Sequence, residues 1–398
     1  MDAQMKEHFP DRTWAEMDVN ALVQNVRSVR ELTRPAAKVM AVVKADAYGH
    51  GAVFCAKLFL ENGADLLGVS NVDEARQLRE AGIDAQILIL GYTDIRHAPY
   101  IVSADITATV FSLGSARILS EEAIRQNKTT KIHIKLDTGM GRIGYTPDSP
   151  YREEIEEIFR LPNLNIEGVF SHFSTSDEEN DYVRTQFARF ENMLSELERC
   201  GIHFPIKHMC NSAAILRYPE YHLDMVRAGI ILYGLIPGEL PESLPTDCFR
   251  PVMTLKTSLV MVKALPPHEA VGYGRAFETG RVTSVGTIPV GYADGYSRRL
   301  SNKAQVLVRG HRVPVIGNIC MDQSMIDLSD MQEKPGVSEE VVLFGHQKDG
   351  QSEVLLPAGD LAEKMGTIHY EVTCIVGKRV TRIYRKNGKI IHMFNTIW

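Results

Sequence analysis

The run Val39-Met40-Ala41-Val42-Val43-Lys44 is apolar throughout until its final lysine. Strands buried on both faces of a parallel sheet have this character. Seven further β-like runs follow, with segments of helical spacing between them. They are Leu66–Ser70, Gln86–Leu90, Ile106–Phe111, Lys131–Leu136, Ile166–Ser171, Ile206–Cys210 and Met225–Ile231. Eight strands alternating with helices over about 230 residues predict an α/β fold of the (β/α)8 TIM-barrel type. A doubly wound open sheet is the alternative, and the count of eight favours the barrel.

The pattern changes after Ile236-Pro237-Gly238, at the start of a proline-rich stretch that extends to Pro251. Beyond it, short alternating runs with glycine-containing turns predict a mostly β domain, interrupted by one helix at Pro357–Met365. We therefore expect a barrel domain over residues 13–240 and a C-terminal β-domain over residues 241–398. The sequence leaves open whether residues 1–12 join the barrel or the β-domain. The expected strands are Thr254–Val262, Val282–Pro289, Gln305–Val308, Val313–Ile316, Glu340–Phe344, Tyr370–Val376 and Val380–Tyr384.

Composition and charge exclude several functional classes. The formal net charge of −6 argues against nucleic acid as the main partner, because surfaces that bind phosphate backbones carry a basic excess. No apolar window is long enough for a membrane span, and the first residues lack the apolar core of a secretory signal. The six cysteines are scattered without a C-x-x-C pair, which is typical of a reducing compartment. We therefore expect a cytoplasmic enzyme, and no metal site is predicted.

Lys44 is the first candidate for chemistry because it closes a fully apolar strand. One interpretation is a lysine whose amine reaches out of the strand end into solvent. The other is a partly desolvated amine, whose lowered pKa would supply the free base that a Schiff base requires. The carboxyl ends of barrel strands are the usual place for catalytic groups, and this makes the second interpretation competitive.

The segment Gly139-Met140-Gly141-Arg142-Ile143-Gly144 fits the pattern G-x-G-x-x-G of dinucleotide-binding loops. Such a loop must open a helix at once, whereas the turn-like Thr146–Pro150 follows here. We therefore interpret the match as coincidental and expect the glycines to shape a tight loop that places Arg142. A guanidinium in such a loop at the mouth of a barrel can hold a carboxylate by two hydrogen bonds.

Two further loops are candidates for binding a phosphate group. TIM barrels often build such sites after their seventh and eighth strands. Ser212 follows the seventh run and Gly229 lies near the eighth. Taken singly, Ser212 fits a helix N-cap and Gly229 fits a turn. Their joint placement favours a phosphate-binding cup.

The run AVVKADAYGHGA (41–52) resembles the cofactor-lysine motif of the alanine racemase family, whose members use pyridoxal 5′-phosphate (PLP). The resemblance continues in order along nearly the whole chain, and several motifs of six or more residues in register are specific together. The other motifs are LDTGMGRIG (136–144), SHFS (171–174), CNSAA (210–214), VRAGIILYG (226–234), VGYGRAF (271–277), VGYADGYSR (290–298), ICMDQ (319–323) and GTIHYEV (366–372).

The resemblance implies a two-base racemisation of alanine. Lys44 would bind the cofactor covalently and act as the base on one face of the substrate. Tyr273 would be the second base, contributed by the other subunit of a homodimer. Arg142 and Met321 would contact the substrate. The product D-alanine would supply peptidoglycan synthesis.

The resemblance also assigns the cofactor-binding residues. A phosphate cup is implied from Tyr48, Ser212, Gly229, Ile230 and Tyr370. Arg227 would face the pyridine nitrogen, where many PLP enzymes place a carboxylate. Because arginine only donates hydrogen bonds, that nitrogen should stay unprotonated, which limits side reactions. His172 would hydrogen bond Arg227. Supporting roles are implied for Lys135 (as a carbamylated lysine that orients Arg142), Asp322 and Tyr292.

Three alternatives stay open beside an alanine racemase. A serine or broad-spectrum racemase is the nearest, although such relatives are typically exported. A non-catalytic PLP-binding barrel protein would lack the β-domain and the second base. A decarboxylase on a related plan would want a carboxylate in place of Arg227. One departure from the family is Asn318, which stands where an arginine or a small polar residue is common and would line the substrate entry corridor.

Overall fold

Strand pairing and chain contacts divide the described chain into two units. The computed structural model describes residues 12–238, 240–241, 243–350 and 352–395. The first unit consists of Leu22–Tyr48 and Ala52–Arg250. The second combines Gly49–Gly51 with the described residues of Met1–Ala21 and Pro251–Trp398. The division after Arg250 lies close to the boundary predicted after residue 240.

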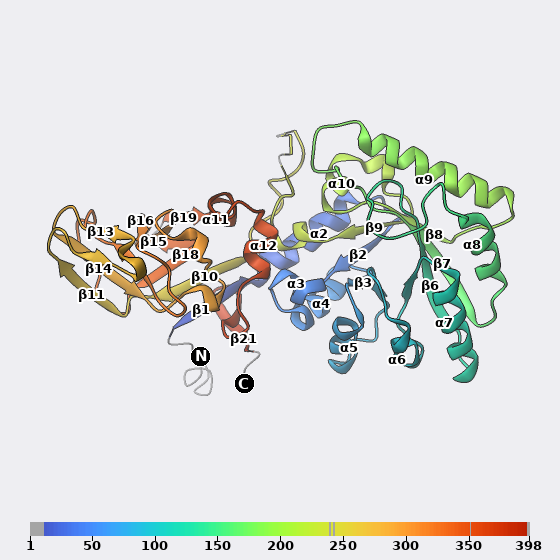
Figure 1. Ribbon diagram of the computed structural model, residues 1–398, viewed down its shortest axis with the longest axis horizontal. Coiled ribbons are helices and arrows are strands. Elements are labelled where there is room, and N and C mark those ends of the chain that lie inside the picture. Colours follow the sequence, from blue (N-terminus) through green and yellow to red (C-terminus); the bar gives the residue numbers. More distant parts are fainter. Residues whose placement is uncertain (1–11, 239, 242, 351, 396–398) are drawn as a thin grey trace. The chain divides into compact units, whose positions relative to one another are not determined.

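The first unit is built on eight parallel strands within its described residues (Figure 1). They follow one another around a ring in chain order, and the last strand pairs with the first. The ring closes between the third and fourth strands, where Ile89 N donates to Thr107 O at 3.0 Å and Thr107 N to Ile87 O at 2.9 Å. The predicted (β/α)8 barrel is confirmed. The strands are β2 (Lys38–Val42), β3 (Leu66–Val69), β4 (Ile87–Ile89), β5 (Ala108–Val110), β6 (Thr130–Lys135), β7 (Leu164–Phe170), β8 (Ile206–His208) and β9 (Met225–Ala228).

Helices alternate with these strands, and side-chain caps fix where several of them begin. Asp18 Oδ1 accepts from Asn20 N at 2.8 Å at the start of the first helix. Asn71, Ser112 and Asn211 cap later helices in the same way, because their side-chain oxygens accept from backbone N–H groups left unpaired at a helix start. The helices are α2 (Val19–Leu32), α4 (Ala52–Glu61), α5 (Val72–Glu80), α6 (Ala98–Ser103), α7 (Leu113–Arg125), α8 (Tyr151–Arg160), α9 (Tyr182–Arg199) and α10 (Ser212–Arg217).

The barrel interior is apolar with a few polar exceptions. Strand residues such as Met40, Leu67 and Ile134 are fully buried, as the continuous apolar runs predict. Among the described strand residues of the barrel, four ionisable side chains interrupt this core, although each is at most 3% exposed: His133, Lys135, His208 and Arg227. Polar groups are buried at such cost that each needs partners, so these four mark the part of the barrel where function is to be sought.

The second unit is a mostly β structure whose described strands form one eleven-stranded sheet and one two-stranded sheet. The large sheet has the order β11-β14-β17-β16-β15-β18-β10-β1-β20-β21, and β19 pairs with β18. Its strands are β1 (Thr13–Asp18), β10 (Met253–Ser258), β11 (Met261–Leu265), β14 (Thr283–Ile288), β15 (Gln305–Val308), β16 (His311–Ile316), β17 (Ser324–Asp327), β18 (Glu340–Asp349), β19 (Ser352–Leu356), β20 (Thr381–Lys386) and β21 (Lys389–Phe394), and the small sheet consists of β12 (Ala270–Val271) and β13 (Phe277–Glu278).

The N-terminal strand belongs to this second sheet. Sequence analysis assigned residues from position 13 onward to the barrel domain, whereas β1 lies between β10 and β20. Of the residues left open at 1–12, only Arg12 lies within the described chain. Its guanidinium donates to Pro289 O at 3.2 Å and to Asp322 O at 3.1 Å, both in the second unit.

Two predicted strands of the β-domain differ in the structure. Tyr370–Val376 is not a strand: the helix α12 (His369–Cys374) lies there, shortly after the predicted helix α11 (Ala358–Met365). Ile375 N donates to Glu371 O at 2.9 Å, a helical bond, and a short apolar run does not distinguish the two structures. Thr254–Val262 is two strands rather than one, because the chain leaves its partner β18 after Ser258 and then pairs with β14.

Candidate functional site

Lys44 lies at the carboxyl end of β2, at the start of a left-handed turn. The next four residues, Ala45 to Tyr48, have φ between 53° and 55°, although none of them is glycine. An L-residue in this conformation costs roughly 1–2 kcal/mol. Four such residues in succession make a strained backbone, which persists only where the surrounding structure imposes it. The strained turn lies at the carboxyl end of a barrel strand, where catalytic groups usually lie.

The strained turn is held by hydrogen bonds at both ends. Ala45 N donates to Glu74 Oε1 at 2.8 Å, and the other carboxylate oxygen of Glu74 accepts from Ser70 N at 2.7 Å. Asp46 Oδ1 accepts from Ala52 N at 2.7 Å. Glu74 thus ties the turn after β2 to the end of β3, and this fixes the backbone from which Lys44 extends.

Tyr48, Ser212 and Gly229 converge, as expected of a phosphate cup. Gly229 N donates to Ser212 Oγ at 2.9 Å. A Cβ added at Gly229 would lie only 2.7 Å from the hydroxyl oxygen of Tyr48 and 3.6 Å from Ser212 Oγ. Asn211, rather than Ser212, caps the following helix. The Ser212 hydroxyl is therefore not the cap of that helix, and it accepts from Gly229 instead. The buried Ile230 follows directly at the start of the 3-10 helix η3 (Ile230–Tyr233).

Arg227 is buried inside the barrel and fixed by four acceptors. Its Nη2 donates to Ser171 O, Met209 O and His172 Nδ1, each at 2.9 Å. Its Nη1 donates to His208 Nδ1, also at 2.9 Å. The expected hydrogen bond between His172 and Arg227 is thus present. Among the described residues no hydrogen bond uses Nε of Arg227.

The surroundings of Arg227 keep its histidine partners neutral. Burial and the neighbouring guanidinium lower the pKa of His172 and of His208 well below the usual value. Burial also lowers the pKa of Arg227 itself, to about 10, which leaves it charged at neutral pH. A neutral imidazole accepts at one nitrogen, so each ring presents a lone pair to the guanidinium.

The glycine-rich loop after β6 wraps around a carboxylate of its own chain. Asp137 Oδ1 accepts from Gly139 N, Met140 N and Gly141 N, and Asp137 Oδ2 accepts from Arg142 N at 2.8 Å. Burial would raise the pKa of Asp137, but these backbone bonds hold it below the usual value. The next helix, α8, begins only at Tyr151. The loop is therefore no dinucleotide site; it presents the exposed Arg142.

Lys135 is buried beside this loop at the end of β6. Its Nζ donates to Leu136 O at 2.5 Å and lies 5.3 Å from the centre of the Phe170 ring. Burial, reinforced by Arg227, lowers its pKa to about 7. A large share of this amine is therefore uncharged near neutral pH, which is the form that reacts as a nucleophile.

Tyr273 and Tyr292 lie on the short 3-10 helices η4 (Tyr273–Arg275) and η5 (Tyr292–Asp294), which are hydrogen bonded to the loop of Met321 and Asp322. Asn318 Nδ2 donates to Tyr273 O at 2.7 Å. Tyr292 N donates to Cys320 O, and Ala293 N to Met321 O, both at 3.1 Å. Tyr273, Tyr292 and Met321 are 69%, 42% and 53% exposed, so three large side chains stand out from adjoining loops.

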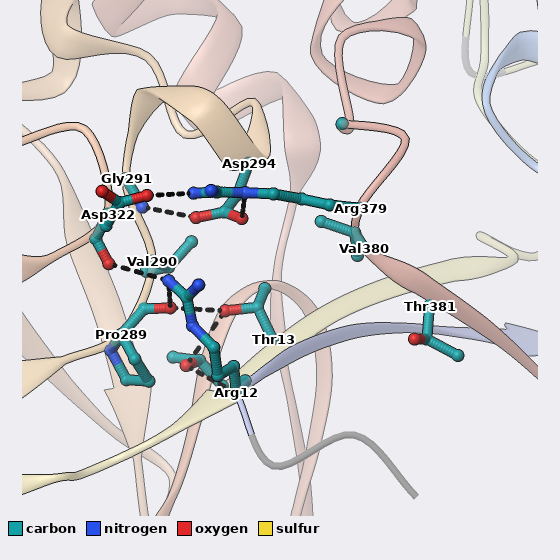
Figure 2. Close-up of polar contacts among 12 residues, drawn as sticks. Arg12, Thr13, Pro289, Val290, Gly291, Asp294, Asp322, Arg379, Val380 and Thr381 are labelled. Carbon is teal, nitrogen blue, oxygen red and sulfur yellow. Dashed lines mark hydrogen bonds and ion pairs between the residues drawn. The ribbon is translucent and has the colours of Figure 1, made fainter. Parts of the chain in front are cut away.

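An ion-pair cluster around the buried Asp294 supports this surface (Figure 2). Arg379 donates to Asp294 Oδ1 and to Asp322 Oδ1, each at 2.6 Å, and these bonds raise its pKa. Asp294 Oδ2 in turn accepts from Gly291 N at 2.9 Å. Arg379 thus joins the loop of Asp322 to the turn of Tyr292. Gly377 N donates to Asp294 O at 2.8 Å. This bond connects the turn of Tyr292 to the segment that follows helix α12, and the half-buried Tyr370 lies on that helix.

The predicted site residues thus form two groups, each within one unit. The barrel group contains Lys44, Tyr48, Lys135, Arg142, His172, Ser212, Arg227, Gly229 and Ile230, and the second group contains Tyr273, Tyr292, Met321, Asp322 and Tyr370. Sequence reasoning missed several residues that organise these groups: Glu74, His133, Asp137, Glu167, His208 and Arg379. His133 and Lys135 stand two apart on an apolar strand, so both point into the barrel, and this was the available signal.

Comparison with known proteins defines the class first: a barrel and a β-domain of an amino-acid racemase. The family model described as "Alanine racemase, N-terminal domain" matches residues 17–237, and "Alanine racemase, C-terminal domain" matches residues 252–384. "Alanine racemase 1" of Clostridium acetobutylicum is 46% identical over 385 residues, which are 96% of this chain and 98% of the relative. The chain belongs to the alanine racemase family.

Solved structures agree with this relationship. The alanine racemase of Bacillus anthracis with bound L-Ala-P superposes with a TM-score of 0.90 and 36% identity, covering 98% of this chain and 99% of that one. The Bartonella henselae alanine racemase with covalently bound pyridoxal phosphate gives a TM-score of 0.84 and 28% identity, covering 94% of this chain and 100% of that one.

Two further observations concern the described part of the chain only. No helix in it is both long and apolar enough to cross a membrane. No group of three or more His, Cys, Asp or Glu side chains in the same residues is arranged to hold a metal ion.

Proposed function

We propose that this chain interconverts L-alanine and D-alanine with pyridoxal 5′-phosphate bound in its barrel. The family relationship supports the reaction and the cofactor. The observation that carries the assignment of residues is the cup of Tyr48, Ser212 and Gly229 in the same barrel as Lys44 and the buried Arg227. A Cβ at Gly229 would fill this cup, which fits a ligand that approaches the backbone closely. When bound, the cofactor acidifies the Cα–H bond of the amino acid.

The barrel residues have separate tasks in this proposal. Lys44 would hold the cofactor covalently, and its free amine would remove or return the Cα proton on one face. Arg227 would donate a hydrogen bond to the pyridine nitrogen, which must then be unprotonated, because a guanidinium cannot accept a hydrogen bond. Its backbone and histidine acceptors fix this orientation. Arg142 binds the substrate carboxylate, and Lys135, with its lowered pKa, is the amine suited to carbamylation beside it.

The second group of residues would act across a homodimer interface. Tyr273 is the base for the opposite face and stands 69% exposed on its unit, as a residue offered to another subunit would. Met321 contacts the substrate from the same surface, which Asp322 and Tyr292 support. Tyr370 binds the cofactor phosphate. We thus propose a homodimer in which each site uses the barrel of one subunit and Tyr273 of its partner.

The physiological role follows from the product. D-Alanine is a building block of peptidoglycan, so we propose that the enzyme supplies cell-wall synthesis. None of the six cysteines, all of which lie within the described residues, is in a disulfide, as is usual in a reducing compartment, and this supports a cytoplasmic location.

A polarimetric assay on the purified protein tests the proposal. The protein loaded with pyridoxal 5′-phosphate should racemise either alanine enantiomer, and borohydride should fix the pyridoxyl group on Lys44. Lys44→Arg should abolish both activity and labelling, whereas Lys57→Arg, at an exposed position of α4, should change neither. Labelling at another lysine, or an active Lys44→Arg variant, would remove Lys44 from its assigned role.

A further inference from the structure

A chain of hydrogen bonds runs from Arg227 through two buried histidines to a carboxylate. His208 Nδ1 accepts from Arg227 at 2.9 Å, and His208 Nε2 lies 2.9 Å from His133 Nδ1. His133 Nε2 lies 3.2 Å from Glu167 Oε2. Both histidine side chains are fully buried, whereas the Glu167 side chain is 18% exposed. This series of hydrogen bonds therefore connects the buried guanidinium of Arg227 to the carboxylate of Glu167 at the edge of the barrel interior.

The chemistry of the groups fixes the direction of every bond in this chain. A guanidinium only donates, so Nδ1 of His208 must be the acceptor. The proton of a neutral His208 then sits on Nε2, and it can only be donated to Nδ1 of His133. The proton of His133 is in turn on Nε2 and points to the carboxylate. Both rings are thus neutral Nε2–H tautomers, in agreement with the lowered pKa values of both histidines.

Arg227 has no carboxylate partner of its own among the described residues. Its acceptors are two backbone carbonyl groups and two neutral histidines. A buried cation without a counter-ion is costly unless a negative charge reaches it indirectly. Glu167 is the carboxylate at the far end of its hydrogen-bond chain. Each bond in such a chain polarises the next in a medium of low dielectric constant.

Packing fixes the positions of the His133 and His208 rings. A Cβ at Gly168 would lie 2.5 Å from Cε1 of His133, so the ring occupies the space that any larger residue would need. Phe170 stacks on His208 with ring centres 4.7 Å apart and an angle of 6°. Gln86, just before β4, donates to both Glu167 and Thr107, which anchors the carboxylate at the amino-terminal end of the barrel.

We propose that Glu167 is a positioning residue for Arg227, acting through His133 and His208. Its carboxylate accepts the hydrogen bond at the far end of the two tautomers, and its charge stabilises the guanidinium that faces the cofactor. This inference rests on the proposed function, since it gives Arg227 the pyridine nitrogen as its target. The alternative is that the four groups merely satisfy one another's hydrogen bonds, in which case the charge of Glu167 has no effect on Arg227.

The first test needs no variant and no cofactor. Long-range proton–nitrogen NMR spectra of the protein labelled with ¹⁵N-histidine report the tautomer of each ring. We expect His133 and His208 both to be neutral with the proton on Nε2. A proton on Nδ1 of His208, or a doubly protonated ring at either position, overturns the proposal. This result is independent of racemase activity, whose absence would instead reject the proposed function.

The second test uses Glu167→Gln, which keeps the shape and removes the charge. The control is Glu154→Gln on α8, where a half-buried carboxylate accepts from Leu113 N at 3.0 Å and from Tyr145 at 2.8 Å, remote from Arg227 in the hydrogen-bond network. With cofactor labelled at the pyridine nitrogen, Glu167→Gln should shift the ¹⁵N resonance. It should also lower kcat about tenfold with little change in KM, the size of effect that outer-shell partners typically have.

The outcomes separate the two interpretations. A shifted pyridine resonance together with a lower kcat in Glu167→Gln, and neither change in Glu154→Gln, supports the proposed role of Glu167. An unchanged resonance in Glu167→Gln, or equal shifts in both variants, overturns it. Should Glu167→Gln fail to fold, Glu167→Asp replaces it: the shorter side chain keeps the charge but withdraws it from His133 Nε2, so the pyridine resonance should again shift, and an unchanged resonance overturns the proposal.

Discussion

At the scale of single residues, Lys135 makes stability depend on pH. Its pKa falls from 10.5 to about 7 on folding because burial disfavours the charged amine. Between these values the unfolded chain binds a proton that the folded chain lacks, so stability should rise with pH by up to about 1.4 kcal/mol per unit. Lys135→Met should therefore stabilise the protein most near pH 7 and least near pH 10. Urea unfolding in buffers free of carbon dioxide measures the difference.

The control is Lys57→Met, which removes an exposed amine from α4. It should leave the pH dependence of the unfolding free energy unchanged. Equal slopes for Lys135→Met and the unmodified protein would mean that Lys135 stays protonated in the fold or is already modified.

Residue types with unusual chemistry could be predicted from the sequence, and their supporting partners could not. Lys44 stands out because a charge at the end of a fully apolar strand is rare, whereas the role of Arg227 is implied only by the resemblance to the family. Glu167 and Asp137 look like ordinary acidic residues, since nothing local shows that one ends a hydrogen-bond chain and the other collects four backbone N–H groups. Such partners come from other strands or from loop geometry, and only the folded chain brings them together.

At the scale of elements, the left-handed turn after β2 stores strain that a glycine would release. Ala45 is exposed with φ 53°, so Ala45→Gly removes a Cβ that makes no buried contact. We expect a gain of about 1 kcal/mol in unfolding free energy. The matched control is Ala188→Gly in the right-handed helix α9, also exposed, which should lose about 1 kcal/mol. Thermal unfolding of both variants decides, and a loss at both positions would contradict the strained geometry.

The loop of Asp137 offers a second prediction at this scale. Asp137→Asn keeps one acceptor oxygen but loses the one that Arg142 N uses. We expect a loss of roughly 1–3 kcal/mol in stability and, if Arg142 binds the substrate carboxylate, a KM for alanine that rises more than kcat falls. Asp148→Asn, at an exposed position before α8, is the control and should leave both unchanged. A normal KM in Asp137→Asn would mean that the loop does not position Arg142.

Barrel strands were predictable because burial on both faces leaves a continuous apolar signature. The short runs of the β-domain are less informative, as Tyr370–Val376 demonstrates. Its Val372 and Thr373 are buried on one side of the short helix α12, and six residues are too few for helical and extended periodicity to differ. The assignment of β1 depends on pairing with strands more than 200 positions away, which no local pattern records.

At the scale of the whole molecule, the proposed catalytic residues fall into two groups, each held rigidly within its own unit. Lys44 is fixed by the turn after β2, and the loops around Tyr273 are fixed by hydrogen bonds and by Arg379. Each group has its own supporting hydrogen bonds, yet neither holds both proposed bases. This division makes the subunit origin of each base separable by mutation.

Mixing two inactive variants tests that origin. In a heterodimer of Lys44→Ala and Tyr273→Phe chains, one site carries both defects and the other carries none, if Tyr273 acts across the interface. Random exchange makes about half of the dimers mixed, so roughly a quarter of the unmodified activity should return. The control pairs Lys44→Ala with Arg227→Glu. Both defects then belong to the barrel, every site keeps one, and no activity should return. No recovery in the test mixture, once native mass spectrometry shows mixed dimers, would mean that both bases come from one chain or that Tyr273 is not a base. Recovery in the control would mean that Lys44 and Arg227 do not serve the same site.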